Sequence, residues 1–318
     1  MSNKNNRRSI QELSLIDDFL FTEVMLHKET AELITKLILE RALGIRPKNL
    51  IIEPQKTING IDTDRHGIRM DVSIMEVGDK GENEDNEENK DHKYKGNGEM
   101  KDEADKNSEI IRVYDIEPNN ITSINLPKRS RYYQAITDVK LLSAGVDYDK
   151  LPELIAIWIL PYDPFGKNYM IYSVKNIVEG FEDLYYNDGI RKVFLYTDGK
   201  LGGSSELKQL LTYIKNSSME NAKGIQLEKL HLGVEWLKKS SEIGVKYMQM
   251  WEIMEYEKKQ SRQEGMEAGI QSGIQSGILK SVEMIREMNI HDEDILEKIM
   301  KTYELDEKTV KKYISKNT

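Results

Sequence analysis

Residues 154–160 read LIAIWIL and are followed by Pro161, and this run indicates the fold class. An apolar stretch of this length without alternation is typical of a strand that is buried on both faces, as in the centre of a parallel or mixed sheet. Outward from this run, the patterning of apolar residues predicts further strands at residues 50–52, 70–77, 110–116, 169–174 and 192–196.

Two helices are predicted beside these strands by apolar residues at helical spacing. The first covers residues 15–43 and would end at Gly44. The second covers residues 127–145, with proline at its start and glycine at its end. Its buried stripe is predicted to comprise Tyr132, Ala135, Ile136, Val139 and Leu142. The order of elements predicts an α/β protein with a central mixed sheet flanked by helices and an α-helical C-terminal extension.

The C-terminal third is predicted to be helical. Residues 265–278 read GMEAGIQSGIQSGI, with glycine at every fourth position. In a helix these glycines form one slowly drifting stripe, so the segment is predicted to be either a linker helix or a helix through which copies of the chain associate. Residues 281–316 predict three short helices. A helix-turn-helix over residues 292–314 is less favoured than a partner-binding role because its turn is acidic.

Composition predicts four regions along the chain. A disordered N-terminus covers residues 1–13, an α/β domain residues 14–215, a helical linker residues 216–280 and a small helical tail residues 281–318. Within the α/β domain, residues 78–108 contain almost nothing apolar and are predicted to be a disordered insertion between two paired strands. The alternative, a calcium-binding loop, lacks the regular carboxylate spacing of an EF-hand.

The composition excludes several kinds of site. The chain has no cysteine, which excludes disulfides, thiolate zinc sites and cysteine nucleophiles. Its five histidines are scattered, so a zinc site is not expected. The net charge of -9 leaves nucleic-acid binding open, because local basic patches matter more than the sum. The polar start of the chain and the lack of a long apolar run predict a cytoplasmic protein.

Two acidic residues on predicted strands could carry chemistry. Asp71 lies within an apolar strand, and Glu117 ends the next strand on the same face as Asp115. Magnesium is held by one or two carboxylates together with water and phosphate oxygens. Such an ion polarises a phosphodiester and activates water. Asp71 and Glu117 therefore predict a magnesium site if their strands are neighbours. The alternative is that both acids line the polar face of a half-exposed sheet.

Six short motifs occur in order along the predicted α/β domain. They are IDDFLF at residues 16–21, GIRMDV at 67–72, YDIE at 114–117, LPKRSRYYQ at 126–134, GVDY at 145–148 and YDPFG at 162–166. In this set the chain resembles the PD-(D/E)XK nuclease-family transposases, also called Rpn-family recombination-promoting nucleases. The resemblance implies a restriction-endonuclease-like core that cuts DNA with magnesium.

The resemblance also implies roles for individual residues. Asp71 would match the strand aspartate and Glu117 the acid of the next strand, both as metal ligands. Asp18 would match the acidic residue of the N-terminal helix, and the alternative is that Asp18 is an ordinary N-cap. Asn119 stands where the family usually has Gln and the wider superfamily Lys. It would position the water or the scissile phosphate, with a shorter side chain and no positive charge.

Three basic residues lie in the first turns of the second predicted helix. Lys128, Arg129 and Arg131 occupy a position where free backbone N–H groups also attract phosphate. They are predicted to hold the DNA backbone without reading bases. The alternative for the arginines is an ion pair with Asp138 or Asp147.

The sequence thus predicts a magnesium-dependent DNA endonuclease that is associated with transposition or recombination. A second hypothesis, favoured by Asn119, is a catalytically inactive DNA-binding or assembly protein that keeps the same fold. A third is a self-associating scaffold in which the glycine-repeat helix matters most.

Overall fold

The computed structural model describes residues 8–58, 68–79, 108–120, 125–288 and 290–315. The chain divides into two compact units, Met1–Tyr247 and Met248–Thr318. Most of the insertion predicted at residues 78–108 and the first part of the predicted disordered N-terminus lie outside the described residues. Among the described helices, none contains a stretch long and apolar enough to cross a lipid bilayer.

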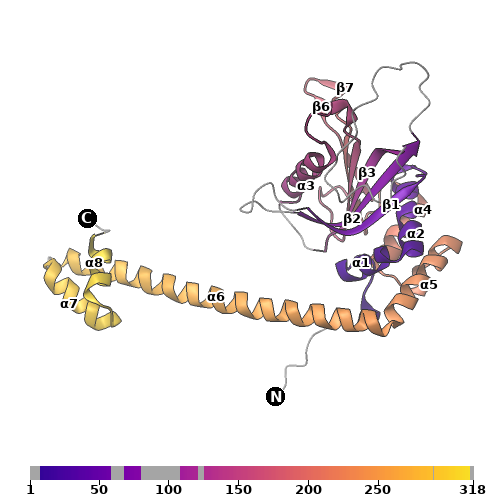
Figure 1. The fold of residues 1–318 in the computed structure, drawn as a ribbon. Coiled ribbons are helices and arrows are strands. Elements are labelled where there is room, and N and C mark those ends of the chain that lie inside the picture. Colours follow the sequence, from indigo (N-terminus) through magenta and orange to yellow (C-terminus); the bar gives the residue numbers. More distant parts are fainter. Residues whose placement is uncertain (1–7, 59–67, 80–107, 121–124, 289, 316–318) are drawn as a thin grey trace. The chain divides into compact units, whose positions relative to one another are not determined.

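A six-stranded mixed sheet forms the centre of the first unit (Figure 1). Its strands, in spatial order, are β1 (Leu50–Ile58), β2 (Ile68–Asp79), β3 (Ser108–Pro118), β4 (Glu153–Leu160), β8 (Ile190–Tyr196) and β5 (Ile171–Val174). β1, β2 and β3 are antiparallel neighbours, β3, β4 and β8 run parallel, and β5 runs antiparallel to β8. The predicted strands are all present, and the run at residues 154–160 forms a central strand, as predicted; it runs parallel to both of its neighbours.

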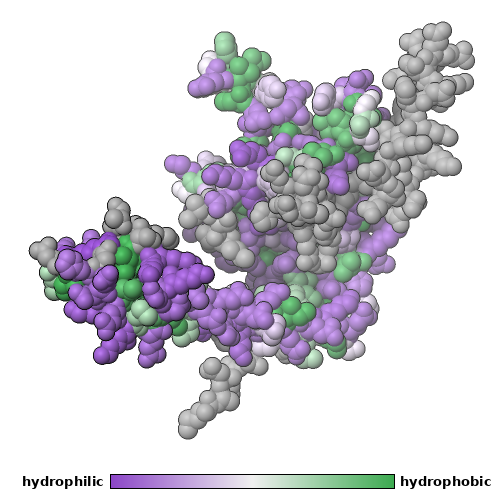
Figure 2. Space-filling view, turned by 60° about the vertical axis from the view of Figure 1, so that its left-hand side comes forward, coloured by the Kyte–Doolittle hydropathy of each residue, from purple (hydrophilic) through white to green (hydrophobic). Residues whose placement is uncertain are grey.

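A small hairpin beside this sheet was not predicted. It pairs β6 (Ile177–Val178) with β7 (Phe181–Tyr185). The side chains of Ile177, Phe181 and Leu184 are all exposed. Figure 2 shows a projecting segment with apolar residues at the top of a largely hydrophilic surface. These strands are too short for a period of two to stand out in the sequence.

Helices cover both faces of the sheet (Figure 1). One face carries α3 (Leu126–Leu141), and the other side carries α1 (Asp18–Leu26), α2 (Lys28–Ile38), α4 (Ser205–Lys215) and α5 (Ile225–Lys239). Short helical turns are η1 (Ile10–Glu12), η2 (Leu39–Leu43), η3 (Tyr148–Lys150) and η4 (Met219–Asn221). The predicted architecture, an α/β protein with a helix-flanked mixed sheet, is confirmed at this level.

The single helix predicted over residues 15–43 is wrong, because the backbone is extended at His27 and separates α1 from α2. The Thr30 hydroxyl lies within hydrogen-bond distance of the carbonyls of Val24, at 2.7 Å, and His27, at 2.9 Å, and so links the first turn of α2 to the end of α1. Apolar spacing continues across this break, which is why it does not show in the sequence. Gly44, with φ 69°, does end the following turn as predicted.

The face that α3 buries also differs from the prediction. Tyr132 is 39% exposed and Val139 is 56% exposed, so the predicted core position of Tyr132 is wrong. Ile136 is buried as predicted, and the other buried residues of α3 are Leu126, Ser130, Thr137 and Leu141. α3 also ends at Leu141, and Gly145, with φ 82°, lies in the turn that follows. The stripe is displaced because α3 covers a sheet face that carries acidic side chains as well as apolar ones.

Both faces of the sheet are covered where the acids lie. On β2, Val72 and Ser73 point to opposite faces and both are buried. On β3, Asp115 is 3% exposed and Glu117 is 1% exposed. For Glu117 the alternative of a half-exposed polar face is therefore wrong, and its burial requires another explanation; Asp71 is half-buried.

The second unit is helical. It contains part of α6 (Ser241–Glu287) together with α7 (Asp292–Tyr303) and α8 (Glu307–Ser315). Its buried apolar residues are Ile278, Val282, Ile295, Ile299 and Val310. Three short helices were predicted here, but the first of them is the end of α6. Of the four repeat glycines only Gly277 has a close neighbour among the described atoms: a Cβ there would lie 3.2 Å from the Tyr303 hydroxyl.

Candidate active site

Strand pairing brings Asp71 and Glu117 together across 46 residues of sequence. β2 and β3 are antiparallel, with Val72 opposite Ile116, so Asp71 and Glu117 are the next pair along the ladder. The backbone N–H of Asp71 donates to Oε1 of Glu117 at 2.8 Å. The two acids that the sequence analysis assigned to one site are therefore direct neighbours.

Burial and mutual repulsion shift the titration of three carboxyl groups. The pKa of Asp71 is raised to about 9, chiefly by burial and secondly by the negative charge of Glu117. Burial, and next the charge of Asp71, raises the pKa of Asp115 to about 8. The pKa of Glu117 is also raised by burial and by Asp115, while the N–H of Asp71 opposes that rise. The charge of Arg129 opposes these shifts, but the effect of burial is larger for all three groups.

Asp18, at the first position of α1, belongs to the same cluster. It forms a side-chain hydrogen bond with Asp71, and its charge raises the pKa of both Asp71 and Glu117. The alternative in which Asp18 is the helix N-cap is wrong, because Asp17 holds that position. Four acids from three elements, Asp18, Asp71, Asp115 and Glu117, thus interact with one another.

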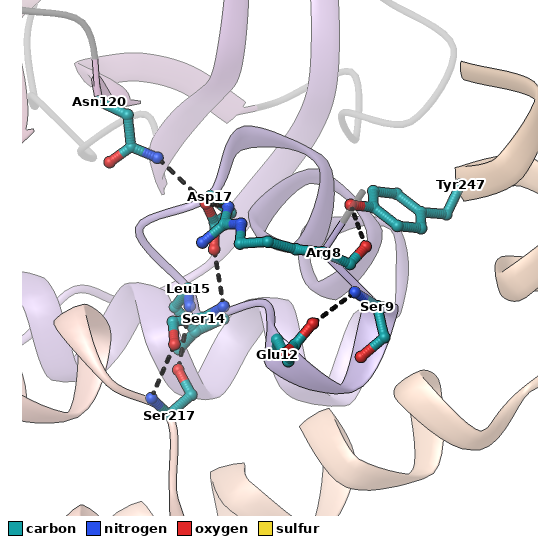
Figure 3. A network of polar contacts seen from close by, with 9 residues as sticks. All are labelled: Arg8, Ser9, Glu12, Ser14, Leu15, Asp17, Asn120, Ser217 and Tyr247. Atoms are coloured by element: carbon teal, nitrogen blue, oxygen red, sulfur yellow. Dashed lines mark hydrogen bonds and ion pairs between the residues drawn. The ribbon is translucent and has the colours of Figure 1, made fainter. Parts of the chain in front are cut away.

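Asp17 anchors the start of α1 beside this cluster (Figure 3). Its carboxylate accepts a hydrogen bond from the backbone N–H of Ser14 at 2.8 Å and one from Nδ2 of Asn120 at 3.3 Å. It also forms an ion pair with Arg8. Because Asn120 comes two residues after β3 ends, these contacts tie the start of α1 to the end of the strand that carries Glu117.

Asn119 is buried directly after β3. Its backbone N–H donates to the carbonyl of Ile159 in β4 at 2.9 Å, which continues the pairing of β3 with β4 by one residue. The role predicted for its side chain, positioning the water or the scissile phosphate, stays a prediction.

Of the three basic residues at the start of α3, Arg129 is the one that forms an ion pair with these acids in the described part of the chain. Its Nη2 lies 3.6 Å from Oε2 of Glu117 and donates to the Tyr133 hydroxyl at 2.9 Å. The acid that it pairs with is therefore Glu117, and not Asp138 or Asp147. Lys128 and Arg131 are exposed, so both side chains are open to an approaching ligand.

The sequence analysis left Asp115 out of the candidate site residues. Its position could have been found from the alternation of β3, since Asp115 and Glu117 are two residues apart and share a face. Tyr133 and Trp158 were also missed. Their part in the site depends on the packing of α3 over β4, which no local pattern reveals.

The oxygen-rich cluster suits a hard divalent cation. Oδ1 of Asp115 is buried and makes no hydrogen bond among the described residues, so it is an acceptor available to a ligand. Within the described ranges, no group of three or more acidic or histidine side chains forms a preassembled metal cage.

Comparison with known proteins adds no identification. No family model, no curated protein and no solved structure matches this chain.

Proposed function

We propose that this protein is a magnesium-dependent DNA endonuclease with a restriction-endonuclease-like core, and that it acts in transposition or recombination in the cytoplasm. One observation carries the proposal: half-buried Asp71 and buried Glu117 are neighbours on adjacent strands, joined by a 2.8 Å hydrogen bond, and among the described residues Arg129 is the cation that pairs with them. Burying several carboxyl groups against one another is unfavourable unless a cation or a reaction uses them.

In this proposal each acidic residue has a defined task. Asp71 and Glu117 hold the ion, and Asp115 offers a further carboxylate oxygen. Bound magnesium would polarise the phosphate and lower the pKa of an attacking water. Hydrolysis then joins the water oxygen to phosphorus and breaks the bond from phosphorus to the leaving ester oxygen. One water proton is released to solvent, and the leaving oxygen takes up a proton.

DNA would be held along the start of α3. Lys128 and Arg131 are exposed there, and the first backbone N–H groups of the helix attract phosphate. These groups contact phosphate and carry no base information, so the proposal includes no sequence preference.

A plasmid-nicking assay tests the proposed function. Wild-type protein with magnesium is compared with Asp71→Asn, which keeps the size of the side chain and removes its charge. The matched control is Asp149→Asn, which changes an exposed aspartate in η3. We expect cleavage by the wild type and the control and none by Asp71→Asn. Equal cleavage by all three proteins would remove the assigned site.

A second candidate is a DNA-binding or assembly protein without catalysis. Asn119 favours it, because this residue replaces the Gln of the family and the Lys of the superfamily. This candidate predicts that the wild type retains DNA without cutting it. Gain of cleavage in Asn119→Gln or Asn119→Lys would support it, and cleavage by the wild type would reject it.

A further inference from the structure

We infer that Arg129 is a catalytic residue of this site, whose guanidinium contacts the scissile phosphate and supplies the positive charge that Asn119 lacks. The inference rests on the proposed nuclease function and adds a residue to it. In the sequence analysis Arg129 was one of three equivalent backbone contacts, and the geometry separates it from the other two.

The guanidinium lies at the boundary between solvent and the buried acids. The side chain of Arg129 is 39% exposed, whereas that of Glu117 is 2% exposed. A phosphate that approached Glu117 from the solvent side of Arg129 would therefore meet the guanidinium. Lys128 and Arg131 carry the same charge on the same helix, but in the described part of the chain neither forms an ion pair with these acids.

The contact with Glu117 does not use all the hydrogen-bond donors of Arg129. The 3.6 Å separation exceeds the length of about 2.8 Å that is usual for a charge-assisted hydrogen bond. Of the five N–H donors of a guanidinium, one is used by the Tyr133 hydroxyl at 2.9 Å. The remaining N–H donors can bind the oxygens of a phosphate at the exposed part of the side chain. The planar fork of the guanidinium matches the geometry of those oxygens.

Two aromatic rings hold the guanidinium in place. Cζ of Arg129 lies 4.9 Å from the ring centroid of Tyr133 and 5.1 Å from that of Trp158. Trp158 is fully buried in β4, opposite Glu117 in the strand pairing. A donor fixed in this way needs little reorganisation when charge develops on a phosphate, which is the condition for strong electrostatic stabilisation.

The charges around the site also support a phosphate-binding role for Arg129. The guanidinium of Arg129 is a cation 3.6 Å from Oε2 of Glu117, and Oε1 of the same carboxyl accepts the backbone N–H of Asp71. A DNA phosphate is itself anionic and would be repelled by these acids. A fixed cation beside Glu117 offsets that repulsion at the place where the phosphate must bind.

Matched single substitutions on α3 test the inference. Arg129→Ala is compared with Arg131→Ala, which removes the same charge two residues away. Cleavage is measured with magnesium at saturating DNA, and the DNA Kd is measured with calcium in its place. For Arg129→Ala we expect cleavage to slow by roughly 10²–10³-fold, as on removal of a donor to a developing charge, with little change in Kd. For Arg131→Ala we expect mainly a weaker Kd. The control Lys140→Ala, which removes an exposed charge in the last turn of α3, should leave both the rate and the Kd unchanged.

Chemical rescue separates a catalytic role from a structural one. Low millimolar guanidinium should restore part of the rate of Arg129→Ala and should not affect Arg131→Ala. Arg129→Lys, which keeps the charge but loses the fork, should lie between the wild type and Arg129→Ala. If Arg129→Ala does not fold, Arg129→Lys decides the question, and a wild-type rate in that variant overturns the inference.

Two further outcomes also overturn it. One is an unchanged cleavage rate in Arg129→Ala. The other is a loss of DNA affinity equal to that of Arg131→Ala with the rate intact, which would make Arg129 a backbone contact. Failure of the wild type to cut more than Asp71→Asn is a different result, because it rejects the proposed function itself and the inference with it.

Discussion

The backbone N–H of Asp71 donates a 2.8 Å hydrogen bond to Oε1 of Glu117, which is 1% exposed as a residue. This contact joins two acids that are 46 residues apart in the sequence, Asp71 on β2 and Glu117 on β3. It also means that the two acids cannot move apart without breaking the pairing of β2 with β3. The geometry that the proposed chemistry needs is therefore part of the sheet and not of a loop.

Stability of the metal-free protein is predicted to depend on pH through Asp71. Its folded-state pKa of about 9 lies above that of an unfolded aspartate, so the folded state binds more protons across the interval between them. Its contribution is therefore most favourable at low pH and becomes destabilising as pH rises toward 9. We expect Asp71→Asn to raise the Tm relative to wild type at pH 8 and to leave it unchanged near pH 4. A difference in Tm that is the same at both pH values would contradict this prediction.

Magnesium is predicted to stabilise the wild type more at pH 8 than at pH 5. A bound cation favours ionised carboxylates, and at pH 5 it must displace protons from groups whose pKa is raised. Differential scanning calorimetry with and without magnesium measures the shift in Tm at each pH. Asp71→Asn is the control and should lose most of the shift. An equal shift in the variant would place the ion elsewhere.

Salt dependence of DNA binding should distinguish the exposed basic residues from Arg129. Each phosphate contact releases counterions, so Lys128→Ala and Arg131→Ala should each reduce the slope of log K against log salt by about 0.9 for duplex DNA. A fluorescence titration over a range of salt concentrations measures it. Slopes that match wild type in both variants would show that DNA does not bind along the start of α3.

The glycine repeat of α6 allows a test of self-association. A Cβ at Gly269 meets no atom of the described residues within 4 Å, so Gly269→Ala should stabilise the helix by roughly 1 kcal/mol. If copies of the chain pack through these glycines, Gly269→Leu should weaken the oligomer, because the larger side chain separates the helices. Sedimentation velocity measures this, with Gln271→Leu as the control between two glycines. Equal effects of both leucines would argue against packing through the glycine stripe.

Several features could be predicted from local pattern alone. The unbroken apolar run at residues 154–160 indicated a buried parallel strand, and alternation placed Asp71 and Glu117 on strands where an acid is unusual. Gly44 was recognised as a helix end because only a few residues adopt its backbone conformation readily. These predictions succeeded because each depends on residues close together in the chain.

Other features followed from contacts between distant segments. The break at His27 interrupts a helical pattern that continues across it, and the buried side of α3 is set by what lies beneath that helix. The inward position of Arg129 depends on Trp158, which comes from a different element. Pairing of β2 with β3 makes neighbours of two acids that are distant in the sequence. Packing of α3 places one of three similar basic residues close to them. Sequence alone determined which chemical groups were available; the tertiary structure decided which of them meet, because burial and proximity arise only when distant segments pack together.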